Sequence, residues 1–167
     1  SDRSFVGTVT EEGKAFLTDG PTGAMHGEPR ELGAPGRWVD FRSGSRQFVT
    51  TAGSKAVVWS VDSKDAIGVP IVHPKGAALR QARFSPDGAW IVTSGEDNTA
   101  RVWEADTHKD VAVLVKHEGA VTGSRFSLDC KILVTTSADG TIVAWDTATW
   151  KQTGQIMILP GEVRSAV

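Results

Sequence analysis

The segment FSPDGAWIVTSGEDNTARVWE, residues 84–104, decides the fold of this chain. It recurs as FSLDCKILVTTSADGTIVAWD at residues 126–146 and, less faithfully, as FRSGSRQFVTTAGSKAVVWS at residues 41–60. Each copy begins with Phe, continues through a polar turn and an apolar run, and carries one Trp near its end. A repeat period of about 42 residues indicates an array of small identical units.

Short apolar runs of strand length recur within each unit, as in residues 90–92. The runs are short, rich in β-branched and aromatic residues, and bounded by Gly, Asp, Asn and Ser, which is typical of antiparallel strands. The pairs Asp87-Gly88 and Asp139-Gly140 lie between such runs, and Asp-Gly is a strong hairpin signal. Helical periodicity is not sustained in any segment. The sequence therefore predicts an all-β domain.

Each complete unit is expected to contain four strands. The units are 1–34, 35–76, 77–118 and 119–160, followed by residues 161–167. The expected strands are 37–42, 46–51, 55–60 and 66–72 in the second unit, 79–84, 89–94, 99–104 and 111–115 in the third, and 121–126, 131–136, 141–146 and 153–158 in the fourth.

Two of these units resemble the blades of WD-repeat proteins. In residues 84–104 the resemblance rests on the Phe-Ser-Pro-Asp-Gly turn, the Thr-Ser-Gly-Glu-Asp segment and the final Trp-Glu. Residues 117–146 show the same features and end in Trp-Asp, whereas the second unit has Ser54 where the family usually has Asp. The resemblance implies a β-propeller built of four-stranded antiparallel blades.

The resemblance also implies a structural hydrogen-bond chain within a blade. It would link a His before the first strand, a Thr in the second strand, an Asp in the turn that follows and the Trp of the third strand. Such buried polar groups are tolerated when they satisfy one another's hydrogen bonds. His73 lies two residues farther from its Phe than His117 does, so its loop should bulge. The expected chains are His73, Thr93, Asp97 and Trp103 in the third unit and His117, Thr135, Asp139 and Trp145 in the fourth.

The two ends of the sequence match different parts of one unit. Residues 161–167 align with 119–125, the start of a first strand, and residues 1–8 align with 86–93, a turn and second strand. We therefore expect a first unit without its first strand, three complete blades and one unpaired first strand. An unpaired strand exposes backbone donors and acceptors and should pair with the sheet that lacks it.

WD-like blades turn by about 45–51° each, so four of them would form half of a ring. We therefore expect a two-fold homodimer with eight blades, in which residues 162–167 of one copy pair with residues 4–9 of the other. The alternatives are a closed four-bladed monomer and a fragment of a longer or nicked propeller. The residues expected to close the ring are Val163, Arg164, Ser165, Ala166 and Val167 with Phe5, Val6 and Thr8.

The composition of the 167 residues excludes several classes of function. The net charge is −2 and the basic residues are scattered, unlike the basic stripe of a nucleic-acid-binding protein. Apolar runs of membrane-spanning length are absent. The single cysteine, Cys130, fits a reducing compartment, so a cytoplasmic location is expected. The sequence also has no cofactor-binding or catalytic motif, and the resemblance gives each His and Asp above a structural role, so neither metal nor cofactor is expected.

The sequence therefore favours a non-enzymatic scaffold that binds a protein or peptide across one propeller face. The residues expected to bind the partner are Arg37, Trp38, Arg80, Glu96, Glu118 and Ala138. One alternative is a ligand-sensing or regulatory module of a larger protein. Another is a hydrolase or lyase acting in the central channel. The charged residues that the first strands offer there are mostly basic, which favours binding of an anion or acidic peptide over acid–base catalysis. They are Asp40, Arg42, Arg83, Arg125 and Arg164.

Overall fold

The computed structural model describes residues 4–164 and contains no α-helix within them. The predicted all-β class is therefore confirmed, and the strands form four antiparallel sheets. They are β1 (Phe5–Val9), β2 (Lys14–Asp19) and β3 (Arg30–Glu31) in sheet 1; β4 (Gly36–Phe41), β5 (Gln47–Ala52), β6 (Lys55–Ser60) and β7 (Ala66–Val72) in sheet 2; β8 (Leu79–Phe84), β9 (Trp90–Gly95), β10 (Ala100–Glu104) and β11 (Asp110–Leu114) in sheet 3; and β12 (Val121–Phe126), β13 (Ile132–Ser137), β14 (Thr141–Asp146) and β15 (Lys151–Ile158) in sheet 4. A 3₁₀ turn, η1 (Pro74–Gly76), leads into sheet 3.

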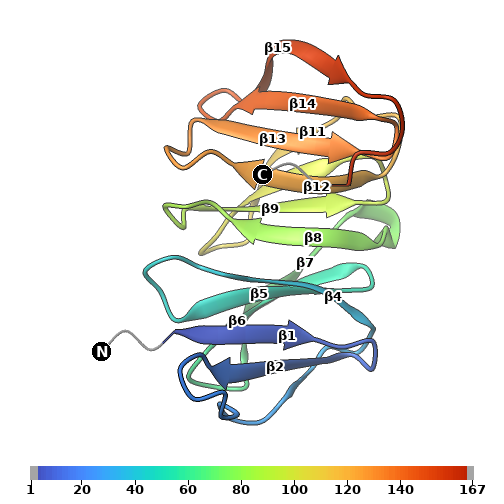
Figure 1. The fold of residues 1–167 in the computed structure, drawn as a ribbon. Helices are drawn as coiled ribbons and strands as arrows, with labels where there is room; N and C mark the ends of the chain where they lie inside the picture. The colour runs from blue at the N-terminus through green and yellow to red at the C-terminus, as the bar shows by residue number, and fades with distance from the viewer. Residues whose placement is uncertain (1–3, 165–167) are drawn as a thin grey trace.

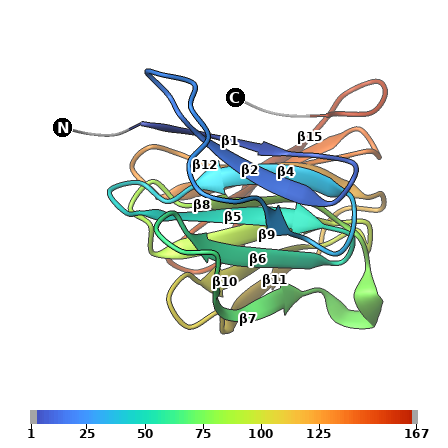
Figure 2. The same cartoon turned by 90° about the horizontal axis from the view of Figure 1, so that it is seen from below.

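The strands of each sheet follow one another in chain order, so each sheet is a meander. Figure 1 shows the four sheets in a row, with the blue sheet 1 at one end and the orange sheet 4 at the other. The first strands β4, β8 and β12 of neighbouring sheets are in contact along the inner edge of the row. Seen from below, β4 and β8 lie toward one edge and β7 and β11 toward the other (Figure 2). The described chain is thus an open row of blades.

The hydrophobic core is divided into layers between adjacent sheets. Because side chains alternate along a strand, a blade with neighbours on both sides is apolar on both faces. In sheet 3, Ile91 and Trp103 pack toward sheet 2, whereas Val92 and Val102 pack toward sheet 4. A third layer, around Leu17, lies between sheets 1 and 2. Burial of each such aliphatic side chain stabilises the fold by about 1.5–3 kcal/mol.

The turns between first and second strands are held by their own side chains. In sheet 3, the Ser85 hydroxyl donates to Asp87 Oδ1 over 2.5 Å, and the same oxygen accepts the backbone N–H of Ala89 over 3.0 Å. Gly88 then takes a left-handed φ of 72°. Cys130 occupies the matching turn position in sheet 4 with a φ of 57°, a conformation that favours glycine.

Sheet 1 differs from the other three because it contains three strands. Its register places Thr18 opposite Val6, as Trp103 lies opposite Ile91 in sheet 3, so Thr18 stands where the other sheets have Trp. Strand β1 therefore corresponds to a second strand, and within residues 4–164 it pairs on one side only, with β2.

The end of the described chain lies against sheet 4. The Val163 backbone N–H donates to the Ser137 carbonyl over 3.1 Å, just as the first residue of β8, Leu79, donates to Gly53 over 2.8 Å. Val163 is 9% exposed, whereas Arg164 is exposed and lies 3.8 Å from the Glu162 carboxylate. Ser165, Ala166 and Val167 of the expected closing strand lie outside the described residues. Helices of the length and apolarity needed to cross a membrane do not occur in residues 4–164.

Candidate functional site

Sheet 3 contains a continuous chain of four hydrogen-bonded side chains. The Trp103 indole N–H donates to the Thr93 hydroxyl over 2.8 Å, and the same oxygen lies 2.8 Å from His73 Nε2. His73 Nδ1 lies 3.1 Å from each carboxylate oxygen of Asp97. The structure thus brings together the four residues expected for this blade, and η1, directly after His73, provides the extra length of its loop.

A neutral imidazole satisfies every group in this chain. Nδ1–H donates to Asp97 and Nε2 accepts the Thr93 hydroxyl proton, while Thr93 accepts the indole N–H. Burial lowers the pKa of His73, and this outweighs the opposing effect of Asp97. Burial alone would raise the pKa of the Asp97 carboxyl, but hydrogen bonds from Thr99 and His73 hold it below its usual value. The chain is therefore a buried structural element with a neutral histidine.

The chain in sheet 4 takes a different route from the expected one. Trp145 donates to Thr135 over 2.9 Å, and Thr135 lies 2.7 Å from His117 Nε2, but His117 Nδ1 contacts the Thr141 hydroxyl over 2.7 Å. Thr141 in turn donates to Asp139 Oδ1 over 2.5 Å. The direct link between His117 and Asp139 is thus replaced by one through Thr141.

The reason for this route lies in the loop before β12. Asp139 Oδ2 accepts the backbone N–H groups of Glu118 and Gly119 over 2.6 and 3.2 Å. This turns the carboxylate away from the imidazole, and the closest approach to His117 Nδ1 is 4.0 Å. The hydrogen bonds at both oxygens hold the pKa of Asp139 far below its usual range, although burial opposes them.

Sheet 2 keeps the Trp–Thr pair without a histidine. Trp59 donates to Thr50 over 2.9 Å. His26 lies elsewhere, with its ring centroid 4.7 Å from that of Phe5. In residues 4–164 there is no group of three or more His, Cys, Asp or Glu side chains arranged to hold a metal ion.

The residues expected to bind a partner lie mostly on the face formed by the loops before the first strands and the turns after the second strands. We call this the loop face. Glu96 lies between two arginines there, 3.3 Å from Arg37 Nη1 and 3.7 Å from Arg80 Nε. Glu118 is exposed, and its carbonyl accepts a hydrogen bond from Asn98 over 3.0 Å. Ala138 is half-buried at the start of the turn after β13.

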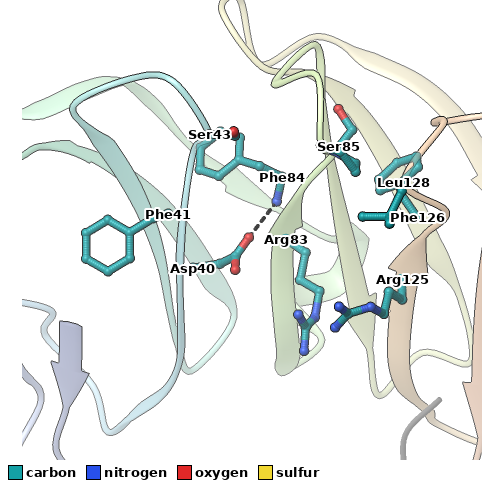
Figure 3. A pocket seen from close by; sticks show the side chains of 10 residues that line it. Asp40, Phe41, Ser43, Arg83, Phe84, Ser85, Arg125, Phe126 and Leu128 are labelled. Carbon is teal, nitrogen blue, oxygen red and sulfur yellow. Dashed lines mark hydrogen bonds between the residues drawn. The ribbon is translucent and has the colours of Figure 1, made fainter. Parts of the chain in front are cut away.

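Trp38 takes part in a different contact. Its ring lies beneath the guanidinium of Arg83, with Cζ 4.4 Å from the ring centroid. Arg83 and Arg125 border a hollow of about 180 Å³ at the inner edge of the sheets. Figure 3 shows the side chains of Arg83 and Arg125 pointing toward one another from β8 and β12, with Asp40 on the β4 side.

Comparison with known proteins identifies the repeat. Residues 68–104 and 108–146 each match the model of the WD domain, G-beta repeat. The chain contains two WD repeats. It is also similar to the Nuclear distribution protein nudF of Aspergillus niger, with 30% identity over 83 residues. That match covers 50% of this chain and 19% of the nudF protein.

The two matched segments of this WD-repeat protein are offset by one strand from its sheets. The match over 68–104 takes in most of β7, the last strand of sheet 2, and then β8 to β10 of sheet 3. The match over 108–146 likewise combines β11 of sheet 3 with β12 to β14 of sheet 4. Each repeat therefore joins two neighbouring sheets covalently.

One buried charge of the WD-repeat protein was not anticipated from its sequence. Arg30 is 4% exposed, and its Nη2 donates to the carbonyls of Ser60, Val61 and Ser63 over 2.9, 3.3 and 2.9 Å. Its guanidinium also lies 5.0 Å from the ring centroid of Phe48. Arg30 thus ties sheet 1 to sheet 2. Its place in an irregular Gly- and Pro-containing stretch gives no sequence signal for this role.

Proposed function

We propose that this WD-repeat protein is a non-enzymatic interaction scaffold whose protein or peptide partner binds across the loop face. The proposal rests on the contrast between the buried histidines and the exposed charged side chains. The buried His73 and His117 are engaged in internal hydrogen bonds with Thr93 and Thr135, which fits a structural role rather than proton transfer. The exposed charges of the loop face remain accessible at its surface, as expected for recognition of a polar partner.

The loop face can be tested by removing its two arginines together. We expect the double variant Arg37→Ala with Arg80→Ala to lose a binding partner that the unaltered chain retains in an affinity capture. Arg46→Ala is the matched control, because Arg46 is an exposed arginine that pairs with Asp62 away from this face. A partner retained equally by all three proteins would place binding outside the loop face.

We further propose that a second copy of the chain completes sheet 1 and closes an eight-bladed ring. The end faces of the row support this. Val6 on the outer face of sheet 1 is 53% exposed, whereas Ile91, at the same position in sheet 3, is fully buried. At the other end Val134 is half-buried, whereas Val92 is fully buried by the next sheet. Each end thus presents a surface that inner sheets bury against a neighbour.

The mass in solution tests this second proposal. Light scattering after size exclusion should give twice the 17.8 kDa of one chain. Val6→Lys places a charge in the expected contact and should shift the mass toward one chain without unfolding the protein. A mass of one chain for the unaltered protein would contradict closure by a second copy. A mass above two chains would contradict a simple two-fold ring.

A further inference from the structure

Two arginine side chains in the described part of the chain lack the hydrogen bonds and ion pairs that the other described arginines form. The side chains of Arg83 and Arg125 form no hydrogen bond or ion pair with residues 4–164. Arg30 is engaged by three carbonyl groups. The remaining arginines of residues 4–164 each lie near a carboxylate, namely Arg37, Arg42, Arg46, Arg80, Arg101 and Arg164.

The two unpaired arginines meet at one place. They extend from the neighbouring first strands β8 and β12, and their guanidinium groups point toward one another beside the hollow (Figure 3). Arg83 is half-buried, and its Nε is buried without a partner, whereas Arg125 is exposed. Two like charges repel each other unless an anion lies between them, and a guanidinium edge matches an oxyanion with two parallel hydrogen bonds.

Trp38 holds one of these guanidinium groups in position. The 4.4 Å separation between Arg83 Cζ and the Trp38 ring centroid is within the range of a cation–π contact. Such a contact uses the planar face of the guanidinium and leaves its N–H edges free. Arg83 is therefore preorganised to donate to a ligand, which reduces the entropy lost on binding.

The charge balance around the hollow favours one additional anion. Among its lining residues Asp40 is the only acid, and it accepts the Phe84 backbone N–H over 2.9 Å. Asp40 is not within ion-pair distance of any described arginine. Two positive charges thus face one negative charge that is already hydrogen-bonded, and one positive charge remains in excess.

We propose that this hollow binds a side-chain carboxylate of an acidic peptide between Arg83 and Arg125. Leu128, which is 90% exposed and lines the hollow, would contact an apolar part of the same peptide. The hollow lies at the opposite end of β8 from Arg80 and Glu96, so it is separate from the loop face. The inference rests on the proposed interaction function and names the chemistry of one partner.

Fluorescein-labelled hexaglutamate is the probe, and its anisotropy with the full chain at low salt is the measurement. We expect Arg125→Gln and Arg83→Gln each to weaken binding about tenfold or more, since each removes a charge-assisted hydrogen-bonding group. Arg46→Gln removes the same charge from an exposed arginine that is paired with Asp62 and does not line the hollow, and it should leave the affinity within about twofold. Because Arg125 is exposed, its replacement by Gln leaves the fold intact, and near-UV circular dichroism checks this.

The intrinsic fluorescence of Trp38 gives an independent readout. Unlabelled hexaglutamate should change the tryptophan emission of the unaltered chain, and Trp38→Phe, which keeps an aromatic ring beneath Arg83, should remove that change. Hexaglutamine should produce neither effect. Equal binding by the unaltered chain and Arg125→Gln would overturn the proposal, as would the absence of hexaglutamate binding at low salt.

Two further results separate this proposal from its alternatives. Displacement of hexaglutamate by inorganic phosphate at lower concentration than by free glutamate would assign the hollow to phosphate groups and overturn the carboxylate assignment. If hexaglutamate fails to bind while the Arg37→Ala with Arg80→Ala variant still loses a captured partner, the hollow is not an anion site and the scaffold function stands.

Discussion

The shared hydroxyl of Thr93 offers a sharp test of the hydrogen-bond chain in sheet 3. Thr93→Val keeps the shape of the side chain but removes the oxygen that lies 2.8 Å from both Trp103 Nε1 and His73 Nε2. Both nitrogens are then left buried without that partner. Each lost hydrogen bond to a buried group costs about 1–3 kcal/mol, so we expect the free energy of unfolding to fall by about 2–6 kcal/mol.

Thr51→Val is the matched control for this change. Thr51 is also a fully buried threonine of a second strand, but its hydroxyl has no hydrogen-bond partner among residues 4–164. Its removal should therefore leave stability unchanged or raise it by up to about 1 kcal/mol, because an unsatisfied polar group is no longer buried.

Denaturant unfolding followed by tryptophan fluorescence measures both variants. A loss of about 2–6 kcal/mol should also lower the melting temperature of Thr93→Val by roughly 4–24 °C, given about 2–4 °C per kcal/mol for a chain of this size. Equal effects of the two substitutions would refute the reasoning, because burial and shape are matched and only the hydrogen bonds differ.

Three further predictions concern pH, a carboxylate and a glycine. Burial lowers the pKa of His73 and His117, so the unfolded chain binds more protons than the folded chain as the pH falls. The free energy of unfolding, measured by denaturant titration, should therefore fall as the pH drops from about 7.5 to about 5.5. An increase would contradict neutral histidines. Asp139→Asn should lower the free energy of unfolding by about 2–3 kcal/mol in the same assay. The carboxylate accepts backbone N–H groups at both oxygens, and the amide would place an N–H donor against one of them. An unchanged denaturation midpoint would show that these bonds are dispensable. Both Gly140 and Gly23 have a positive φ, and Gly23→Ala should cost about 1–2 kcal/mol for that reason. Gly140→Ala should be more destabilising, because only a Cβ at position 140 would meet a backbone oxygen, at 2.5 Å. Equal shifts in melting temperature would rule out that clash.

The regular spacing of the repeats made the strands predictable from the sequence. Observed strand ends in sheets 2 to 4 lie within two residues of the expected ones, because short apolar runs and turn residues mark each boundary locally. The recognition as a WD-repeat protein is confirmed by the two matched repeats.

Side-chain routes could not be predicted in the same way. The sequence pairs His117 with Asp139, but the route through Thr141 depends on which backbone N–H groups the carboxylate reaches. Arg30 was missed because its partners are carbonyl oxygens, which have no residue signature. Likewise, Arg83 and Arg125 were recognisable as basic residues of the inner strands, whereas their convergence and their lack of partners depend on the packing of two neighbouring sheets.

The phase difference between repeats and sheets has a consequence for how the chain can be shortened. A truncation at the boundary between the two matched repeats, near residue 106, would leave sheet 3 without β11 on one fragment and give the other fragment a strand with no sheet. A break just before β8, between residues 76 and 77, would instead keep every described sheet whole. The segment that each match covers is thus not the segment that forms one sheet. Unfolding of one sheet should therefore promote unfolding of the next, because each matched repeat includes the last strand of the preceding sheet.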